Sequence, residues 1–274
     1  MDAKGWNVKQ YTEHNGEQTK SAKKFFMFYA DLLKDLYGDD PVTLIDVGSG
    51  CGRVLVNIIL KDSELKFSKV VGADKCTKMI DHANKTYGSD ELKFHLMDVQ
   101  ECVPECLKSL KFDILTSFYC LHWIHDLKKA FNVISSLLKP GGLFLCVFLK
   151  KHFLAGIYSA LAQKYSPYMD NYENKFSELL FLDNADEVIK GYLTECGFEI
   201  VEFIDVKNDL CDLNSEAIMS ESLEVINPFL SAMPDTLRKA FLQDQIEVSY
   251  KIQTGKKNPF VIKRRIFYFI AKKL

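Results

Sequence analysis

A glycine-rich turn between an apolar run and a helical pattern is the feature that most constrains the fold of this chain. Val42–Val47 is a short apolar run, and residues 48–52, Gly-Ser-Gly-Cys-Gly, follow it directly. From Arg53 to Leu60 apolar residues recur at helical spacing. The order strand, glycine turn, helix is typical of a site where the backbone approaches a nucleotide-like cofactor, and a tight turn without a ligand is the alternative.

The same alternation continues along the chain. Apolar runs predict further strands at Lys69–Ala73, Leu92–Met97, Phe112–Tyr119 and Gly142–Leu149. Helical spacing predicts helices before and between them, at Ser21–Leu36, Thr77–Tyr87, Val103–Leu110 and Leu127–Leu138. Two later runs, Phe198–Val206 and Lys263–Ala271, predict a partly antiparallel edge hairpin. Because strands joined by helical crossovers pair in parallel, we expect an α/β fold: a doubly wound, mostly parallel seven-stranded sheet.

The length of 274 residues fits a single domain, residues 1–274, better than two independent ones. Two stretches that the sheet does not require, residues 151–183 and 208–254, are rich in Phe, Tyr, Leu and Met at helical spacing. They predict helical cap insertions over a site, and the alternative is that they only cover the sheet.

Charge and composition exclude several kinds of partner. The net charge of -2 comes from 35 basic and 37 acidic residues in mixed order, so we expect no nucleic acid partner. No apolar run reaches the roughly 18 to 20 residues that a membrane helix needs. Since residues 1–18 are polar and unlike a signal peptide, we expect a cytoplasmic protein. The eight cysteines include no Cys-x-x-Cys pair, which favours free thiols and no metal site.

An acid two residues before the first glycine indicates which cofactor the turn would hold. A dinucleotide fingerprint starting at Gly48 and Gly50 needs Gly or Ala at position 53, where the chain has Arg53, so NAD is disfavoured. The Asp46 carboxylate suits a positively charged ligand and counts against a pyrophosphate. S-adenosylmethionine carries positive charge on its amino and sulfonium groups. It is therefore the expected cofactor, held by Asp46, Gly48, Ser49 and Gly50.

Two more acids stand where predicted strands end. Asp74 ends the second strand, where a carboxylate can accept hydrogen bonds from both ribose hydroxyls. Asp98 ends the third, where it can accept from the adenine amino group while the backbone N–H of Val99 meets the ring. A single acid at a strand end is as often only a helix cap, so the prediction rests on the set.

The segment after the fourth predicted strand, residues 117–124 (Ser-Phe-Tyr-Cys-Leu-His-Trp-Ile), borders the same crevice in a doubly wound sheet. We expect Phe118 to contact the cofactor and Tyr119 the substrate. The indole N–H of Trp123, beside His122, can act as a neutral donor toward a substrate; packing in the core is the alternative.

These motifs resemble class I methyltransferases, which have a Rossmann-like fold, and in detail the insect juvenile hormone acid O-methyltransferases. The resemblance covers nearly the whole chain and rests on Tyr11, Asn15, Gln18, Asp46–Gly52, Asp98-Val99, residues 117–124, Lys139–Gly142, Ile226–Phe229 and Phe267–Lys272. The glycine motif is common to class I methyltransferases at large, whereas Leu-His-Trp-Ile and Ile-Asn-Pro-Phe are much more specific.

The resemblance implies methyl transfer from S-adenosylmethionine to the carboxylate of farnesoic acid or juvenile hormone acid, a step of juvenile hormone biosynthesis. Gln18 and Trp123 match the Gln and Trp that hold this carboxylate, with His122 and Tyr119 as helpers. The family usually has Asp-Ile-Ser where this chain has Asp74-Lys75-Cys76. We therefore expect Lys75 to lay its alkyl stem on the adenine.

A carboxylic acid with a pKa of roughly 4 to 5 is already ionised at neutral pH, so its methylation needs alignment and exclusion of water rather than a general base. Neutral donors suit this task, because a cation would blunt the nucleophilicity of the carboxylate. An apolar tail would lie along aromatic and aliphatic side chains of the insertions, unless these only pack a core: Tyr158, Tyr165, Tyr168, Phe176, Ile226 and Phe229.

Two alternatives stay open. A methyltransferase for another small carboxylic acid or an amine would share every cofactor residue. A non-catalytic cofactor- or ligand-binding protein with the same fold belongs to a different class, and the intact acids and glycines count against it. The pattern predicts no particular oligomeric state.

Overall fold

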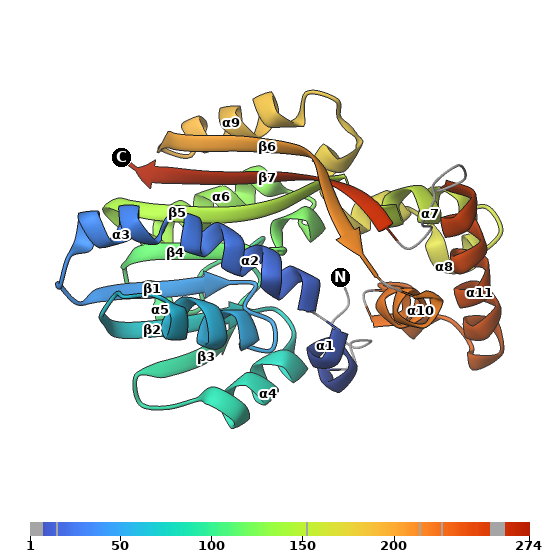
Figure 1. Ribbon diagram of the computed structural model, residues 1–274, viewed down its shortest axis with the longest axis horizontal. Helices are drawn as coiled ribbons and strands as arrows, with labels where there is room; N and C mark the ends of the chain where they lie inside the picture. The colour runs from blue at the N-terminus through green and yellow to red at the C-terminus, as the bar shows by residue number, and fades with distance from the viewer. Residues whose placement is uncertain (1–7, 15, 152, 214, 226, 253–260) are drawn as a thin grey trace.

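The computed structural model describes residues 8–14, 16–151, 153–213, 215–225, 227–252 and 261–274. Its centre is a seven-stranded sheet in the order β3-β2-β1-β4-β5-β7-β6 (Figure 1). The strands are β1 (Val42–Val47), β2 (Phe67–Asp74), β3 (Leu92–Leu96), β4 (Phe112–Phe118), β5 (Leu138–Lys151), β6 (Phe198–Asp212) and β7 (Val261–Lys273).

Helices precede the sheet, connect its strands and form a separate group beside it. Before and between the first five strands lie α1 (Val8–His14), α2 (Gly16–Phe28), α3 (Ala30–Tyr37), η2 (Leu55–Leu60), α4 (Thr77–Tyr87), α5 (Glu105–Lys108), η3 (Leu121–Trp123) and α6 (Leu127–Leu137). After β5 come α7 (Phe153–Leu161), α8 (Ser166–Met169), η4 (Tyr172–Lys175), η5 (Glu178–Phe181), α9 (Ala185–Glu195), α10 (Glu216–Val225), η6 (Leu230–Ala232) and α11 (Asp235–Ile252).

The strand order reverses between β1 and β4. The chain runs outward from β1 through β2 to β3 and then returns to β4 on the other side of β1, with all these pairs parallel. Asp46 lies level with Gly72 of β2 and Thr116 of β4 in this register. A sheet of this kind leaves a crevice at the carboxyl ends of the two strands that flank the reversal, which is where ligands bind in such folds.

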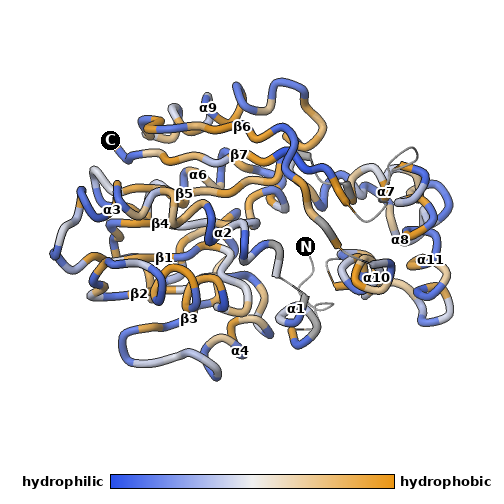
Figure 2. The backbone as a smooth tube through the Cα atoms, viewed as in Figure 1, coloured by the Kyte–Doolittle hydropathy of each residue, from blue (hydrophilic) through white to orange (hydrophobic). Residues whose placement is uncertain are grey.

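Helices cover both faces of the sheet, because alternate side chains of each strand point to opposite faces. On one face α2, α3, η2 and α4 pack on side chains such as Val42 and Leu44. On the other, α5, α6 and α9 pack on Ile45 and Val47. Figure 2 shows the resulting apolar strands in the middle of the molecule. The prediction of a doubly wound, mostly parallel seven-stranded sheet is confirmed.

The helix predicted over Ser21–Leu36 is in fact two helices, α2 and α3, that meet at Tyr29. Tyr29 leaves the helical conformation with φ -102° and ψ 6°. Its ring packs edge-on against Phe25, and its hydroxyl donates a hydrogen bond to Glu202 of β6 over 2.5 Å. Since the break occupies one residue, the apolar spacing runs on through it and local periodicity does not reveal it.

The helix predicted after the glycine turn is wound as a π-helix, η2. Its apolar side chains Leu55, Ile58 and Ile59 are buried against the sheet. π-helical turns are rare and are frequently found at functional sites.

The two last strands pair antiparallel at the edge of the sheet, as predicted, but α10, η6 and α11 lie between them in the chain, so they are not a hairpin. β7 pairs antiparallel with β5 on one side and with β6 on the other, so that β6 is the edge. The β6–β7 pair has a bulge between Val206 and Asp209 and continues past the end of β5, where Asp209 is paired in register with Arg264.

The stretches predicted as cap insertions pack together into one helical body beside the sheet, seen at α7, α8, α10 and α11 in Figure 1. Leu154, Tyr158 and Phe176 from the first stretch share a buried cluster with Met219 and Phe241 from the second. Phe229 and Tyr165 belong to the same cluster, and Tyr168 packs on it. That this body caps a site stays a prediction.

In the described part of the chain, we find no helix whose length and apolar content would let it span a membrane. All eight cysteines carry free thiols, five of them buried.

Candidate cofactor and substrate site

The glycine turn packs so closely on its neighbours that two of its glycines have no room for a side chain. Gly48 has a φ of 80°, and a Cβ there would lie 2.3 Å from Sγ of Cys120. Gly52 has a φ of 81°, and a Cβ would lie 2.8 Å from Cζ of Phe94. Gly50 has a φ of 53° and is more open, with the ring of Tyr11 as its nearest neighbour at 3.7 Å. A ligand would therefore approach the backbone at Gly50.

We expect Gly48→Ala to lower the free energy of unfolding by about 2 to 5 kcal/mol. The left-handed backbone costs a residue with a Cβ about 1 to 2 kcal/mol, and the new methyl group adds an overpacking cost of about 1 to 3 kcal/mol against Cys120. Gly197→Ala is the matched control, because Gly197 has a φ of 81°, close to that of Gly48, with nothing within 4 Å of the added Cβ. Urea unfolding compares the two; equal losses would contradict the close packing described for Gly48.

Three carboxylates gather at the carboxyl ends of β1, β2 and β3. Asp46 is 3% exposed and accepts a 2.8 Å hydrogen bond from Oγ1 of Thr116. Burial raises its pKa to about 7, and the neighbouring Asp74 adds to that rise. Burial also raises the pKa of Asp74, with a further contribution from Asp98. Carboxylates that raise one another's pKa in a buried site favour a cationic ligand, which would relieve both their desolvation and their repulsion.

The second and third acids also hold the backbone around them. Asp74 accepts hydrogen bonds from the backbone N–H of Gly50 at 2.9 Å and of Cys76 at 2.8 Å. Asp98 accepts from the N–H of Gln100 at 3.0 Å. Each oxygen engaged in this way keeps a second lone pair for a ligand donor. The capping role and the ligand role are therefore compatible in one side chain.

Lys75 lies beside the third acid, with Nζ 3.5 Å from Oδ2 of Asp98. Both side chains are partly exposed, at 24% and 29%. The ion pair holds the alkyl stem of Lys75 next to Asp98, where the adenine is predicted to lie. Val99 is 4% exposed and points into the core, so that only its backbone can face a ligand.

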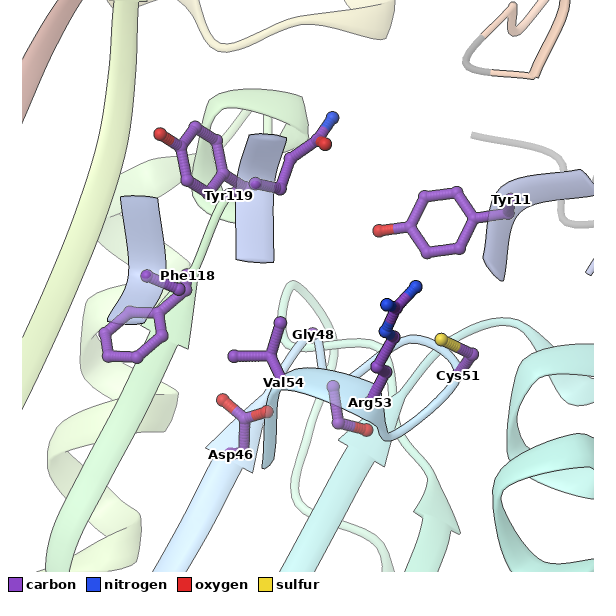
Figure 3. A pocket seen from close by; sticks show the side chains of 11 residues that line it. Tyr11, Asp46, Gly48, Cys51, Arg53, Val54, Phe118 and Tyr119 are labelled. Carbon is purple, nitrogen blue, oxygen red and sulfur yellow. The ribbon is translucent and has the colours of Figure 1, made fainter. Parts of the chain in front are cut away.

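A pocket with about 410 Å³ of empty space, open to solvent, lies at the glycine turn. It is lined by Tyr11, Gln18, Ala22, Asp46, Gly48, Ser49, Cys51, Arg53, Val54, Phe118 and Tyr119. Figure 3 shows Tyr11 reaching in from α1 on one side and Phe118 and Tyr119 from the end of β4 on the other, with Asp46 and Gly48 below. The pocket thus sits where the strand order reverses.

Two buried polar atoms in this pocket have no hydrogen-bond partner among the described residues. They are Oε1 of Gln18 and Oγ of Ser49. A buried polar atom without a partner is costly, so these two atoms indicate that the pocket is built for a polar ligand. Together with the carboxylate cluster, they fit a nucleoside that carries positive charge.

Six of the predicted site residues line this pocket, and the others lie outside its lining. Gln18, Asp46, Gly48, Ser49, Phe118 and Tyr119 line the pocket. Gly50 is tied to Asp74 beside it. Trp123 and His122 lie on η3 just past it, and Phe229 lies in the helical body. Asn15 and Ile226 fall outside the described residues.

Trp123 connects the end of β4 to the helical body. Its ring stacks on Phe176 with 5.2 Å between centroids and lies 5.1 Å from the ring of His122. Phe176 in turn lies 5.9 Å from Tyr158, whose ring meets the edge of Phe229 at 5.0 Å. His122 is 2% exposed. An unbroken row of aromatic rings therefore leads from η3 into the helical body.

Five lining residues were not predicted as site residues: Tyr11, Ala22, Cys51, Arg53 and Val54. Arg53 donates a 2.7 Å hydrogen bond to the backbone oxygen of Thr12 and so links the glycine turn to α1. Ala22 could have been found, because it lies four residues after Gln18 and thus on the same face of a helix. The position of Arg53 signalled only that a dinucleotide fingerprint was absent.

Tyr119 has a φ of 55°, a backbone conformation that residues other than glycine rarely adopt. A bulky residue held there costs of order 1 to 3 kcal/mol, and such strain clusters at functional sites. Its hydroxyl donates a 2.7 Å hydrogen bond to Oγ of Ser21 on α2. The end of β4 is therefore fastened to the helix that carries Gln18.

A methyltransferase domain family matches residues 45–146, from β1 to β5. Juvenile hormone acid O-methyltransferase of Drosophila melanogaster is 32% identical over 255 residues, covering 90% of this chain and 84% of that protein. The enzyme of the same name from Bombyx mori is 27% identical over 244 residues, covering 88% of this chain and 85% of that protein.

Solved structures agree on the fold. Phosphoethanolamine N-methyltransferase 2 of Haemonchus contortus, in complex with phosphomonomethylethanolamine and S-adenosylhomocysteine, has a TM-score of 0.54 at 19% identity over 97% of this chain and 56% of that one. The cyclopropane synthase MmaA2 of Mycobacterium tuberculosis has a TM-score of 0.55 at 13% identity, over 90% of this chain and 84% of that one.

Proposed function

The chain belongs to the juvenile hormone acid O-methyltransferases, a family of class I S-adenosylmethionine-dependent methyltransferases, and we propose that it esterifies the carboxylate of an apolar acid such as farnesoic acid or juvenile hormone acid. One observation carries the proposal. Asp46, a buried carboxylate that suits a cationic cofactor, lines the same pocket as Gln18, a neutral amide that suits an anionic acceptor.

The predicted cofactor residues fit S-adenosylmethionine. Asp46 would face its positively charged end, Asp74 its ribose and Asp98 its adenine, beside the open backbone at Gly50. When bound, S-adenosylmethionine supplies a methyl group on a cationic sulfur. Methyl transfer to a carboxylate joins carbon to oxygen as the carbon–sulfur bond breaks, and the opposite charges of the two reactants disappear.

The side chains around the acceptor stay neutral at physiological pH. Burial raises the pKa of the Tyr119 hydroxyl above its usual range, so it stays neutral and donates its proton to Ser21. Burial and the nearby Asp74 raise the pKa of the Cys120 thiol to about 12, so the thiol does not compete for the methyl group. Since the acid is already ionised, the pocket needs no base, and its task is to align the carboxylate and exclude water.

Gln18 and Trp123 are the proposed donors to the carboxylate, with Tyr119 and His122 beside them. A half-turn of the Gln18 amide about its last bond exchanges its oxygen and its NH₂ group, which can then donate to an anion. The indole N–H of Trp123 would donate from η3. Both donors are neutral, so they orient the anion without the stabilisation by a cation that would lower its reactivity.

The apolar tail of the acid would pack against the partly exposed end of the aromatic row, at Trp123. The row continues through Phe176, Tyr158 and Phe229, which are buried against one another. Hydrocarbon buried at this end contributes about 25 cal/mol for each Å² removed from water. A longer tail would therefore bind more tightly.

The proposal is tested by turnover with radiolabelled S-adenosylmethionine and a panel of acceptors. We expect kcat/KM for farnesoic acid to exceed that for hexanoic and benzoic acid by about 100-fold or more, because each additional buried CH₂ contributes about 0.8 kcal/mol. A primary amine with the same hydrocarbon tail serves as the matched control and should not be methylated. Equal rates for short and long acids, or preference for the amine, would contradict the proposal.

A further inference from the structure

We infer that Ser21, the Tyr119 hydroxyl and the Arg264–Asp209 ion pair act together as positioning residues that hold Gln18 against the acceptor carboxylate. The inference rests on the proposed function in one respect, namely that Gln18 contacts the acid. Ser21, Asp209 and Arg264 do not line the pocket.

Ser21 attaches α2 to the end of β4. Oγ of Ser21 accepts the 2.7 Å hydrogen bond from Tyr119 and lies 3.0 Å from the hydroxyl of Tyr268 on β7. One serine therefore joins α2 to two tyrosines from two strands. Ser21 comes three residues after Gln18, so the two side chains lie on the same face of α2, about 4.5 Å apart along its axis.

Aromatic contacts of Phe25 continue along the same face of α2. Phe25, four residues after Ser21, stacks on Tyr268 with 5.0 Å between ring centroids and an interplanar angle of 17°. It also meets the ring of Phe118 edge-on at 5.7 Å. Phe25 thus packs the last turn of α2, and Ser21 extends this attachment toward the first turn, where Gln18 lines the pocket.

Arg264 contacts the ring of Tyr119 and holds it in its strained conformation. The guanidinium of Arg264 lies 6.0 Å from the centroid of this ring. Arg264 is 8% exposed and is paired with Asp209 on the neighbouring strand β6. Its Nε lies 2.7 Å and its Nη2 2.5 Å from Oδ2 of Asp209. The ring is therefore held by a buried cation on one side and by Ser21 at its hydroxyl.

The ion pair with Asp209 has an electrostatic consequence for the acceptor. A free arginine next to the acceptor would bind the carboxylate and reduce its nucleophilicity. Because Asp209 neutralises Arg264, the pair can orient Tyr119 without attracting the acid. The bulge between Val206 and Asp209 places Asp209 of β6 directly opposite Arg264 of β7.

A double-mutant cycle tests the inference with farnesoic acid as the acceptor. Ser21→Ala should lower kcat about 5- to 20-fold, because a misplaced donor loses alignment with the acceptor. The dissociation constant of S-adenosylhomocysteine, measured by isothermal titration, should stay within about twofold. Tyr119→Phe removes the same hydrogen bond, so the double variant should lose no more than either single variant.

The decisive arm combines Ser21→Ala with Gln18→Ala. If Ser21 acts by placing Gln18, its loss should cost less than about twofold once Gln18 is gone. Multiplying losses would overturn the inference. Ser21→Thr keeps the hydroxyl and should retain most of the wild-type kcat. Arg264→Lys keeps the charge but not the planar contact with Asp209, and it should lower kcat as Ser21→Ala does.

A measurement without substrate separates this inference from the proposed function. Hydrogen exchange of the backbone amides of residues 16–24 should speed up several-fold in Ser21→Ala and stay unchanged in the control Ser136→Ala, an exposed helical serine on α6. Unchanged exchange in Ser21→Ala would overturn the inference whether or not farnesoic acid is methylated. Faster exchange in a protein that does not methylate the acid would count against the proposed function alone.

Discussion

Asp46→Asn is expected to weaken the binding of S-adenosylmethionine about 30- to 150-fold. Asparagine keeps the shape of the side chain and can still accept the hydrogen bond from Thr116, but it removes the negative charge that would face the cationic end of the cofactor. A hydrogen bond between charged groups in a buried site contributes about 2 to 3 kcal/mol, which corresponds to that change in affinity. Isothermal titration with the cofactor and its demethylated product measures the loss.

Asp113→Asn is the matched control, because Asp113 is a carboxylate near the other end of β4 that bonds Thr43 and Lys139. It should leave cofactor affinity within about twofold of the wild type. If both variants lost affinity equally, the effect would come from general destabilisation and the role of Asp46 would be wrong.

The unusual pKa of Asp46 predicts opposite effects on binding and on stability. Since the pKa in the folded protein is about 7 instead of 3.8, the folded state keeps a proton that the unfolded chain loses. Without cofactor, the contribution of Asp46 to stability is therefore greatest below pH 4, falls as the pH rises to 7 and is constant above. Asp46→Asn should raise the melting temperature at pH 8 by a few degrees, and the affinity of the wild type should rise between pH 5.5 and 7.

Gln18→Ala is expected to lower kcat/KM for farnesoic acid about 100-fold, in the range seen when one preorganised donor is removed from an active site. The affinity for S-adenosylhomocysteine should change by less than about twofold, because the Gln18 amide would face the acceptor. Gln243→Ala on α11, where the glutamine is exposed, is the control for loss of an amide from a helix.

Trp123 allows the donor role to be separated from packing in the same assay. Trp123→Phe keeps a ring to stack on Phe176 but lacks the indole N–H, whereas Trp123→Ala loses both. If the N–H orients the carboxylate, Trp123→Phe should lose most of what Trp123→Ala loses. Wild-type rates for both Gln18→Ala and Trp123→Ala would mean that the proposed carboxylate clamp is wrong.

Local order explains why the residues predicted to hold the cofactor lie near one another. Asp46 lies next to the end of β1, the glycines follow β1, and Asp74 ends β2, so that the parallel sheet brings them to one edge. The acceptor side could not be derived in this way. Gln18 was indicated by resemblance alone, and its place in the pocket depends on α2 docking against β4 and β7, which come about 100 and 250 residues later in the chain.

The missed features have equally specific causes. The π-helical winding of η2 could not be predicted, because Leu55, Ile58 and Ile59 have the i, i+3, i+4 spacing that is typical of an α-helix. The break at Tyr29 depends on Glu202 of β6. The strand order β5-β7-β6 could not be predicted from the apolar runs of β6 and β7 either, because either of these two strands could pair with β5.

The interior place of β7 makes assembly of the sheet a late event during synthesis. Ile266, Phe267, Phe269 and Ile270 are fully buried, and they belong to the last strand of this sheet to be synthesised. Until then β5 has a bare flank and β6 has no neighbour to pair with, since its pairing in the sheet is to β7. The nascent chain must therefore wait with an exposed apolar strand edge, a state in which chaperones and aggregation compete for it.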